Sequence, residues 1–97
     1  MSRDSAAWLA DREPPPPVEL REWLTLGEGD LPLVEALADA GRTSLEEAVR
    51  RPGRDRDAAF HLLAADAFFT YACEAAAETE DVEAALRGVL SRIGTRE

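Results

Sequence analysis

The most continuous apolar stretch in the chain covers residues 58–77, where 16 of 20 positions are apolar. Apart from His61, its polar residues recur at a helical spacing of four, as a narrow ridge of Asp66, Thr70 and Glu74. A helix that is apolar around most of its circumference must be covered by neighbours on most sides. The pattern therefore predicts a central helix over about 56–78, capped by Asp55 or Asp57 and surrounded by other helices.

The same stretch has the length of a membrane span, which is the alternative to a buried helix. Ala supplies nine of its 20 positions, however, and Asp66 lies near its middle. An acid at the centre of a membrane helix costs about 3 kcal/mol on insertion scales. We therefore expect a helix within a soluble bundle, and no membrane partner.

A second helical pattern runs through residues 31–51. Gly41, followed by the capping-box pairs Thr43/Glu46 and Ser44/Glu47, would divide it into two helices. The apolar face nevertheless keeps its phase through Gly41, which favours one helix with Gly41 at a close-packed seam. The residues of this face are Val34, Leu37, Ala38, Gly41, Leu45, Ala48 and Val49.

A third pattern follows the turn sequence Thr79-Glu80-Asp81 and ends before Gly94. Its apolar residues form an ordinary one-sided stripe, so we expect this helix to lie on the central one. The stripe consists of Val82, Ala85, Leu86, Val89, Leu90 and Ile93.

The N-terminal quarter combines two short helical patterns with a proline run at residues 14–17. Residues 5–11 allow two turns of helix, and four prolines form a polyproline spacer about 12 Å long. Pro17 opens the next helix, which Gly27-Glu28-Gly29 closes and whose face is Leu20, Trp23, Leu24 and Gly27. The whole pattern predicts an all-α fold: one domain over residues 1–97, a small bundle of four to five helices, with residues 1–17 as a mobile arm.

Composition makes the core of this bundle thin. Eighteen of the 44 hydrophobic residues are Ala, which leaves 25 bulky apolar side chains and one Cys. The central helix must therefore be covered either by the chain's own short helices or by a second chain, and we expect the second chain.

Charge and cysteine content indicate which partners and which cellular compartment to expect. Twenty acids oppose 11 bases, all of them Arg, and the formal charge of −9 disfavours a surface that follows a nucleic-acid backbone. The only cysteine, Cys73, cannot form an intrachain disulfide, and the N-terminus lacks the apolar core of a signal peptide. These features predict a cytoplasmic protein that does not bind nucleic acid.

Candidate chemistry is sparse. Asp57 and His61 have the i, i+4 spacing of two metal ligands, but with one His in the chain a local pair at the helix start is favoured over a metal site. The ridge of Asp66, Thr70 and Glu74 has no recognisable nucleophile or base beside it. We expect no cofactor and no enzymatic activity.

Two groups of residues are candidates for partner contacts. Arginines surround the turn before the central helix and could bind an anion or an acidic partner, although Asp55 and Asp57 alternate with them and favour a solvated turn; they are Arg50, Arg51, Arg54 and Arg56. Large aromatics are common in binding hot spots, and the candidates are Trp8, Trp23, Phe60, Phe68 and Phe69. The alternative is that Trp8 and Trp23 pack across the bundle and that the Phe side chains fill its core.

These features predict a small acidic helical module for protein–protein interaction or assembly, which self-associates as a homodimer. The alternative is a helical bundle that binds an apolar ligand or a metal along its central helix.

Overall fold

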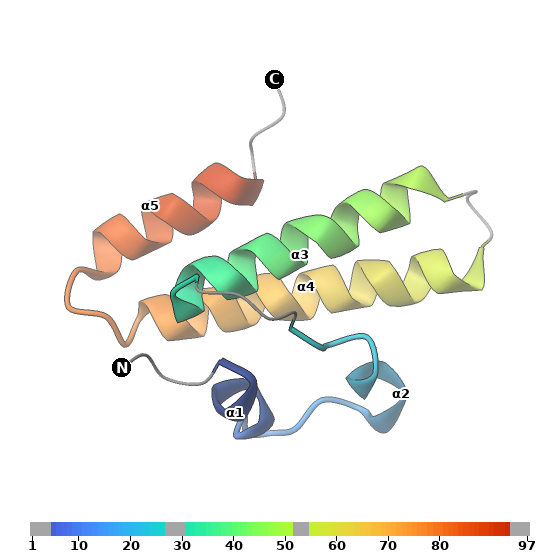
Figure 1. Cartoon of the computed structure of the whole chain (residues 1–97), viewed down its shortest axis with the longest axis horizontal. Coiled ribbons are helices and arrows are strands. Elements are labelled where there is room, and N and C mark those ends of the chain that lie inside the picture. The colour runs from blue at the N-terminus through green and yellow to red at the C-terminus, as the bar shows by residue number, and fades with distance from the viewer. Residues whose placement is uncertain (1–4, 27–30, 52–54, 94–97) are drawn as a thin grey trace.

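Five helices make up the part of the chain that the computed structural model describes, residues 5–26, 31–51 and 55–93 (Figure 1). No strand occurs within these ranges. The prediction of an all-α bundle of four to five helices is confirmed. The helices are α1 (Ser5–Ala10), α2 (Val18–Arg21), α3 (Leu33–Arg50), α4 (Arg56–Ala76) and α5 (Val82–Ile93).

The long helices α3 and α4 lie side by side as an antiparallel hairpin (Figure 1). As predicted, α3 stays a single helix through Gly41, which is buried. A Cβ atom at Gly41 would lie 2.8 Å from the Phe69 ring, closer than real side chains pack. The missing side chain therefore lets α3 approach the Phe69 ring on α4.

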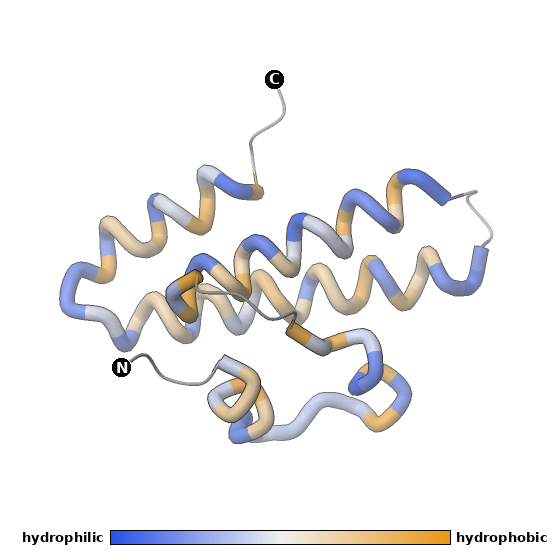
Figure 2. The backbone as a smooth tube through the Cα atoms, viewed as in Figure 1, coloured by the Kyte–Doolittle hydropathy of each residue, from blue (hydrophilic) through white to orange (hydrophobic). Residues whose placement is uncertain are grey.

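Helix α4 is the predicted central helix and ends two residues earlier than expected, at Ala76. It begins at an Asp55 N-cap, whose carboxylate accepts a hydrogen bond from the Asp57 N–H at 2.8 Å. Figure 2 shows apolar colour along most of α4, whereas polar colour recurs along α3. Half of the 12 buried hydrophobic residues in the described parts of the chain are Ala, and five of these belong to α4. The core is thin, as the composition predicted.

The N-terminal arm, residues 5–26, contains two short helices joined by the proline run. Pro17 has φ −56° and ψ 147°, the polyproline conformation, and directly precedes α2. The predicted helix reaching to Gly27 is wrong in extent, because α2 is a single turn that ends at Arg21. An isolated short helix is marginal in water, and Leu20 and Leu24 both reach the core without a further turn. Gly27 and the glycines of its closing turn lie outside the described residues.

Helix α5 lies against α3 and α4 near the end of α4. The Asp81 carboxylate accepts a hydrogen bond from the Ala84 N–H at 3.1 Å, as expected of a helix cap. At its other end, Arg92 pairs with Asp39 of α3 at 3.1 Å. Val89 is the only residue of α5 that is fully buried. The apolar stripe of this helix is therefore only partly covered.

Candidate interaction surface

Trp8 holds the N-terminal arm against the C-terminal part of α4. Its indole Nε1 donates a hydrogen bond to a Glu78 carboxylate oxygen at 3.2 Å, and its ring meets Tyr71 edge-on. The Arg12 guanidinium lies 3.6 Å from the centre of the Trp8 ring and pairs with Glu74 at 3.5 Å. Trp8 is only 1% exposed. These contacts anchor the arm through an aromatic side chain that lies inside the core.

Two of the predicted partner contacts are buried within the chain. Trp8 and Phe68 are both 1% exposed, so neither side chain presents surface to another molecule in this structure. The chain itself uses their apolar surface, because a core built largely of Ala needs its few large side chains. The surface that a partner can contact is therefore formed by other residues.

Trp23 holds the other end of the arm. Its ring stacks on Phe60 with ring centres 5.3 Å apart and planes 3° from parallel. The His61 ring meets the same indole edge-on at 4.9 Å. Trp23, Phe60 and His61 are all half-buried. They form the seam between the arm and the start of α4.

The aromatic side chains of α4 do not gather around one space. Phe60 stacks on Trp23, Phe68 lies in the core and Phe69 contacts Gly41. A shared ligand pocket would need them to converge. The arrangement of these aromatic side chains therefore does not support the alternative of a bundle that binds an apolar ligand.

The weak metal candidates Asp57 and His61 engage different neighbours. A carboxylate oxygen of Asp57 lies 3.9 Å from Arg51, whereas His61 packs against Trp23. Within residues 5–26, 31–51 and 55–93, no group of three or more His, Cys, Asp or Glu side chains could hold a metal ion.

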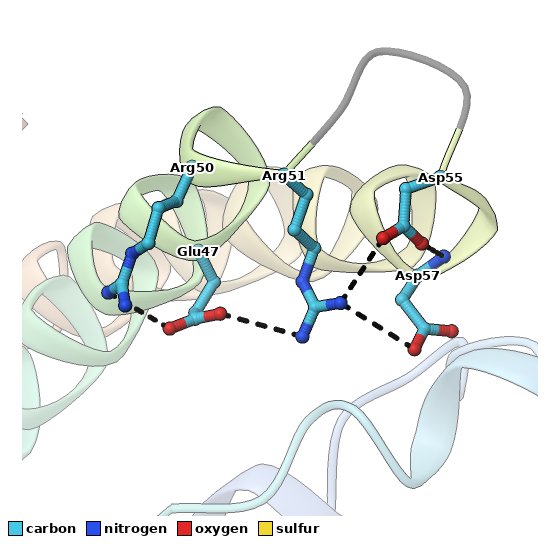
Figure 3. Close-up of polar contacts among 5 residues, drawn as sticks. All are labelled: Glu47, Arg50, Arg51, Asp55 and Asp57. Atoms are coloured by element: carbon cyan, nitrogen blue, oxygen red, sulfur yellow. Dashed lines mark hydrogen bonds and ion pairs between the residues drawn. The ribbon is translucent and has the colours of Figure 1, made fainter.

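Two of the arginines around the α3–α4 turn, Arg50 and Arg51, are paired with carboxylates (Figure 3). Arg51 reaches Glu47 at 3.6 Å and Asp55 at 3.3 Å, and Arg50 reaches Glu47 at 3.0 Å. The pKa of Asp55 is lowered by the hydrogen bond from the Asp57 N–H and, further, by Arg51. Arg56 lies over the Phe60 ring at 5.7 Å, and Arg54 lies outside the described residues. Local pairing thus uses much of the positive charge that an anion or acidic partner would need.

The surface that sequence analysis missed is apolar. Among the described residues, five large aliphatic side chains on four helices are more than half exposed: Val49 at 77%, Val18 at 71%, Leu90 at 65%, and Leu62 and Leu63 at 54% each. The length of α5 does not explain this exposure, because Thr70 and Cys73, on the side of α4 that carries Leu62 and Leu63 but in its second half, are exposed as well.

Comparisons with protein family models, with curated proteins and with solved structures find no match to this chain. None of the helices in the described ranges has both the length and the hydropathy that crossing a membrane requires. The interpretation of this bundle therefore depends on its own residues.

Proposed function

We propose that this chain is a small acidic helical module that binds protein, forms a homodimer and has no catalytic activity of its own. The observation that carries the proposal is the exposure of Val49, Leu62, Leu63 and Leu90 on the three longest helices. Single exposed aliphatic residues are ordinary on a protein surface. Four of them, on a chain of 97 residues with a thin core, favour burial against another chain.

Composition supports the same proposal. Each copy has a formal charge of −9, which disfavours nucleic acid as the partner. We place the module in the cytoplasm, where the lone Cys73 thiol stays reduced. Arg12, Arg50 and Arg51 each pair with a carboxylate of the same chain, which leaves apolar contact as the main source of affinity.

Light scattering coupled to size exclusion tests the proposal on the full chain. The expected result is a mass that rises with concentration from 10.6 kDa to twice that value. A mass that stays at 10.6 kDa at all concentrations up to about 1 mM, the range of weak association, would overturn it.

A further inference from the structure

The proline run, residues 14–17, is held in a polyproline II helix by its own sequence. Proline fixes φ at about −65°, and a residue that precedes proline is excluded from the α region and takes a ψ of about 120–160°. Pro14, Pro15 and Pro16 meet both conditions, and Pro17 has φ −56° and ψ 147°. The whole run therefore has the extended conformation in which proline-rich ligands are recognised.

The run turns two edges of this helix to solvent. A polyproline II helix has three residues per turn, so Pro14 and Pro17 form one edge. Pro15 and Val18 form the second edge, because the φ of an α-helix is close to that of polyproline II and keeps the Val18 Cβ in the same register. All four residues are exposed, Val18 at 71%. Pro16, on the third edge, is half-buried.

Contacts on both sides of the run fix this conformation before any partner binds. Trp8 lies in the core before the run and Leu20 after it. The Arg21 Nε donates a hydrogen bond to the Pro16 carbonyl at 3.2 Å, and the Leu20 N–H donates one to the Pro17 carbonyl at 3.0 Å. The anchored run joins α1 to α2 at the lower edge of the molecule as drawn in Figure 1. A ligand already held in its bound conformation loses little entropy on binding.

Polar groups of the run and beside it have no partner within the chain. No described residue donates a hydrogen bond to the carbonyl oxygen of Pro14 or Pro15. The carboxylates of Glu13 and Glu19, on either side of the run, make no ion pair or hydrogen bond with the described residues. A surface that combines aromatic rings, hydrogen-bond donors and positive charge would complement all of these groups.

A second copy of this chain does not offer such a surface. Among the described residues, Trp8 and Phe68 are each 1% exposed, and Trp23 and Phe60 stack on each other. The formal charge of −9 on a second copy also repels the carboxylates beside the run. The complementary surface therefore belongs to a different protein.

We propose that residues 14–18 are a ligand for an aromatic-lined groove with a basic rim on another protein. The exposed rings of Pro14 and Pro17 pack on aromatic side chains of the groove. Donors of the groove bond to the carbonyl oxygens of Pro14 and Pro15, and positive charges on the rim face the two flanking carboxylates. This inference goes beyond the proposed self-association and does not depend on it.

An SH3 domain is the probe, because its groove recognises polyproline II segments. Two versions of one domain are compared, one with Lys at the rim of the groove and one with Glu at the same positions. The isotope-labelled domain is titrated with the full chain, and the indole N–H signal of the groove tryptophan reports contact with the aromatic groove. The Lys version should bind with a dissociation constant below about 1 mM, at least about tenfold more tightly than the Glu version.

Proline variants test which edges are used. Pro14→Ala and Pro17→Ala should each weaken binding of the Lys version about tenfold, because each removes a ring from an exposed edge. Pro16→Ala removes a ring that the chain half buries, and should change binding less than about threefold.

Pro32→Ala is the matched control for Pro17→Ala. Pro32 is also exposed, has φ −58° and ψ 159°, and directly precedes a helix, α3, but lies outside the run. Its substitution should leave binding unchanged within about threefold. Circular dichroism checks that every variant keeps its helices.

The outcomes separate this proposal from self-association. Binding that Pro14→Ala and Pro17→Ala weaken, and that Pro16→Ala and Pro32→Ala keep, supports the docking ligand. No binding up to about 1 mM, or binding that the first two variants leave unchanged, overturns it and leaves the run as a spacer. Tighter binding by the Glu version overturns the basic rim. A monomeric chain that binds the Lys version overturns self-association alone, and a dimer that does not bind it overturns the docking ligand alone.

Discussion

The indole Nε1 of Trp8 donates a hydrogen bond to the carboxylate of Glu78 across 70 positions of sequence, at 3.2 Å. This contact joins the first helix of the chain to the turn after α4. The Trp8 ring is buried, whereas Glu78 is exposed to solvent. The ring therefore contributes mainly by filling the core, and the hydrogen bond orients it.

Substitutions of Trp8 should separate the contribution of core filling from that of the hydrogen bond. Trp8→Ala is expected to lower the free energy of unfolding by about 3–5 kcal/mol, because it empties a buried aromatic site. Trp8→Phe keeps most of the apolar volume and loses the N–H donor, so it should cost markedly less. Urea unfolding followed by circular dichroism measures both.

Trp23→Ala is the matched control for Trp8→Ala. Trp23 is only half-buried, so its truncation should cost less than that of Trp8. An equal or larger cost at Trp23 would contradict the assignment of Trp8 as the main anchor of the arm.

The two helical glycines should respond in opposite directions to substitution by Ala. Gly88→Ala should stabilise by up to about 1 kcal/mol, because Ala favours helix and nothing lies within 4 Å of the new Cβ. Gly41→Ala gains the same helix propensity, but the new methyl group meets the Phe69 ring at 2.8 Å. Overpacking costs about 1–3 kcal/mol, so the net effect should be destabilising.

Thermal unfolding of both glycine variants checks this prediction. Phe69→Leu combined with Gly41→Ala should recover part of the loss, since it removes the ring that the methyl group meets. A Gly41→Ala variant as stable as Gly88→Ala would mean that the seam between α3 and α4 is looser than the structure has it.

The sequence predicted the long helices well, for a physical reason. In α3, α4 and α5 the apolar period persists over at least 12 residues, and the caps at Asp55 and Asp81 are local features. Helix α2 was predicted too long. The extent of a single turn depends on where Leu20 and Leu24 enter the core, and local helix propensity does not determine it.

The candidate surface was harder to predict. The pairing of Trp8 with Glu78 has no local signature, so Trp8 could not be distinguished from an exposed anchor. Leu62 lies on an apolar side of α4, and we expected a neighbouring helix or a second chain to cover that side. Its exposure follows from the tertiary arrangement, in which the other described helices leave this side of α4 uncovered.

Asp55 should make the stability of α4 depend on pH. Its pKa is lowered in the folded chain, first by the hydrogen bond from the Asp57 N–H, so the unfolded chain binds the proton more tightly. The stabilisation by Asp55 is therefore present above its ordinary pKa of 3.8 and is lost as the pH falls through the lower folded value. Asp55→Ala should reduce stability at pH 7, and its difference from the wild type should shrink below pH 4.

Asp55→Asn separates the cap from the charge. Asn also accepts a hydrogen bond at an N-cap, so this variant should retain much of the stability at pH 7 and lose the dependence on pH that Asp55 contributes. Unfolding midpoints measured between pH 7 and pH 3 test both variants. An Asp55→Ala difference that stays constant over this range would contradict the lowered pKa.

Tyr71 should ionise above its ordinary range in the folded chain. Burial raises the pKa of its hydroxyl above the usual 10.0, and the negative charge of Glu74 raises it further. Because the folded pKa is raised, Tyr71 favours the folded state below pH 10 relative to higher pH, and this stabilisation is lost as the pH rises through the folded value. The chain has one Tyr, so phenolate absorbance at high pH reports this group alone. The absorbance midpoint should lie above 10.0 in the native protein, fall toward 10.0 in urea, and move down in Glu74→Gln. A native midpoint at or below 10.0 would show that the Tyr71 hydroxyl is as well solvated as in a free peptide, contrary to its half-buried place beside Trp8.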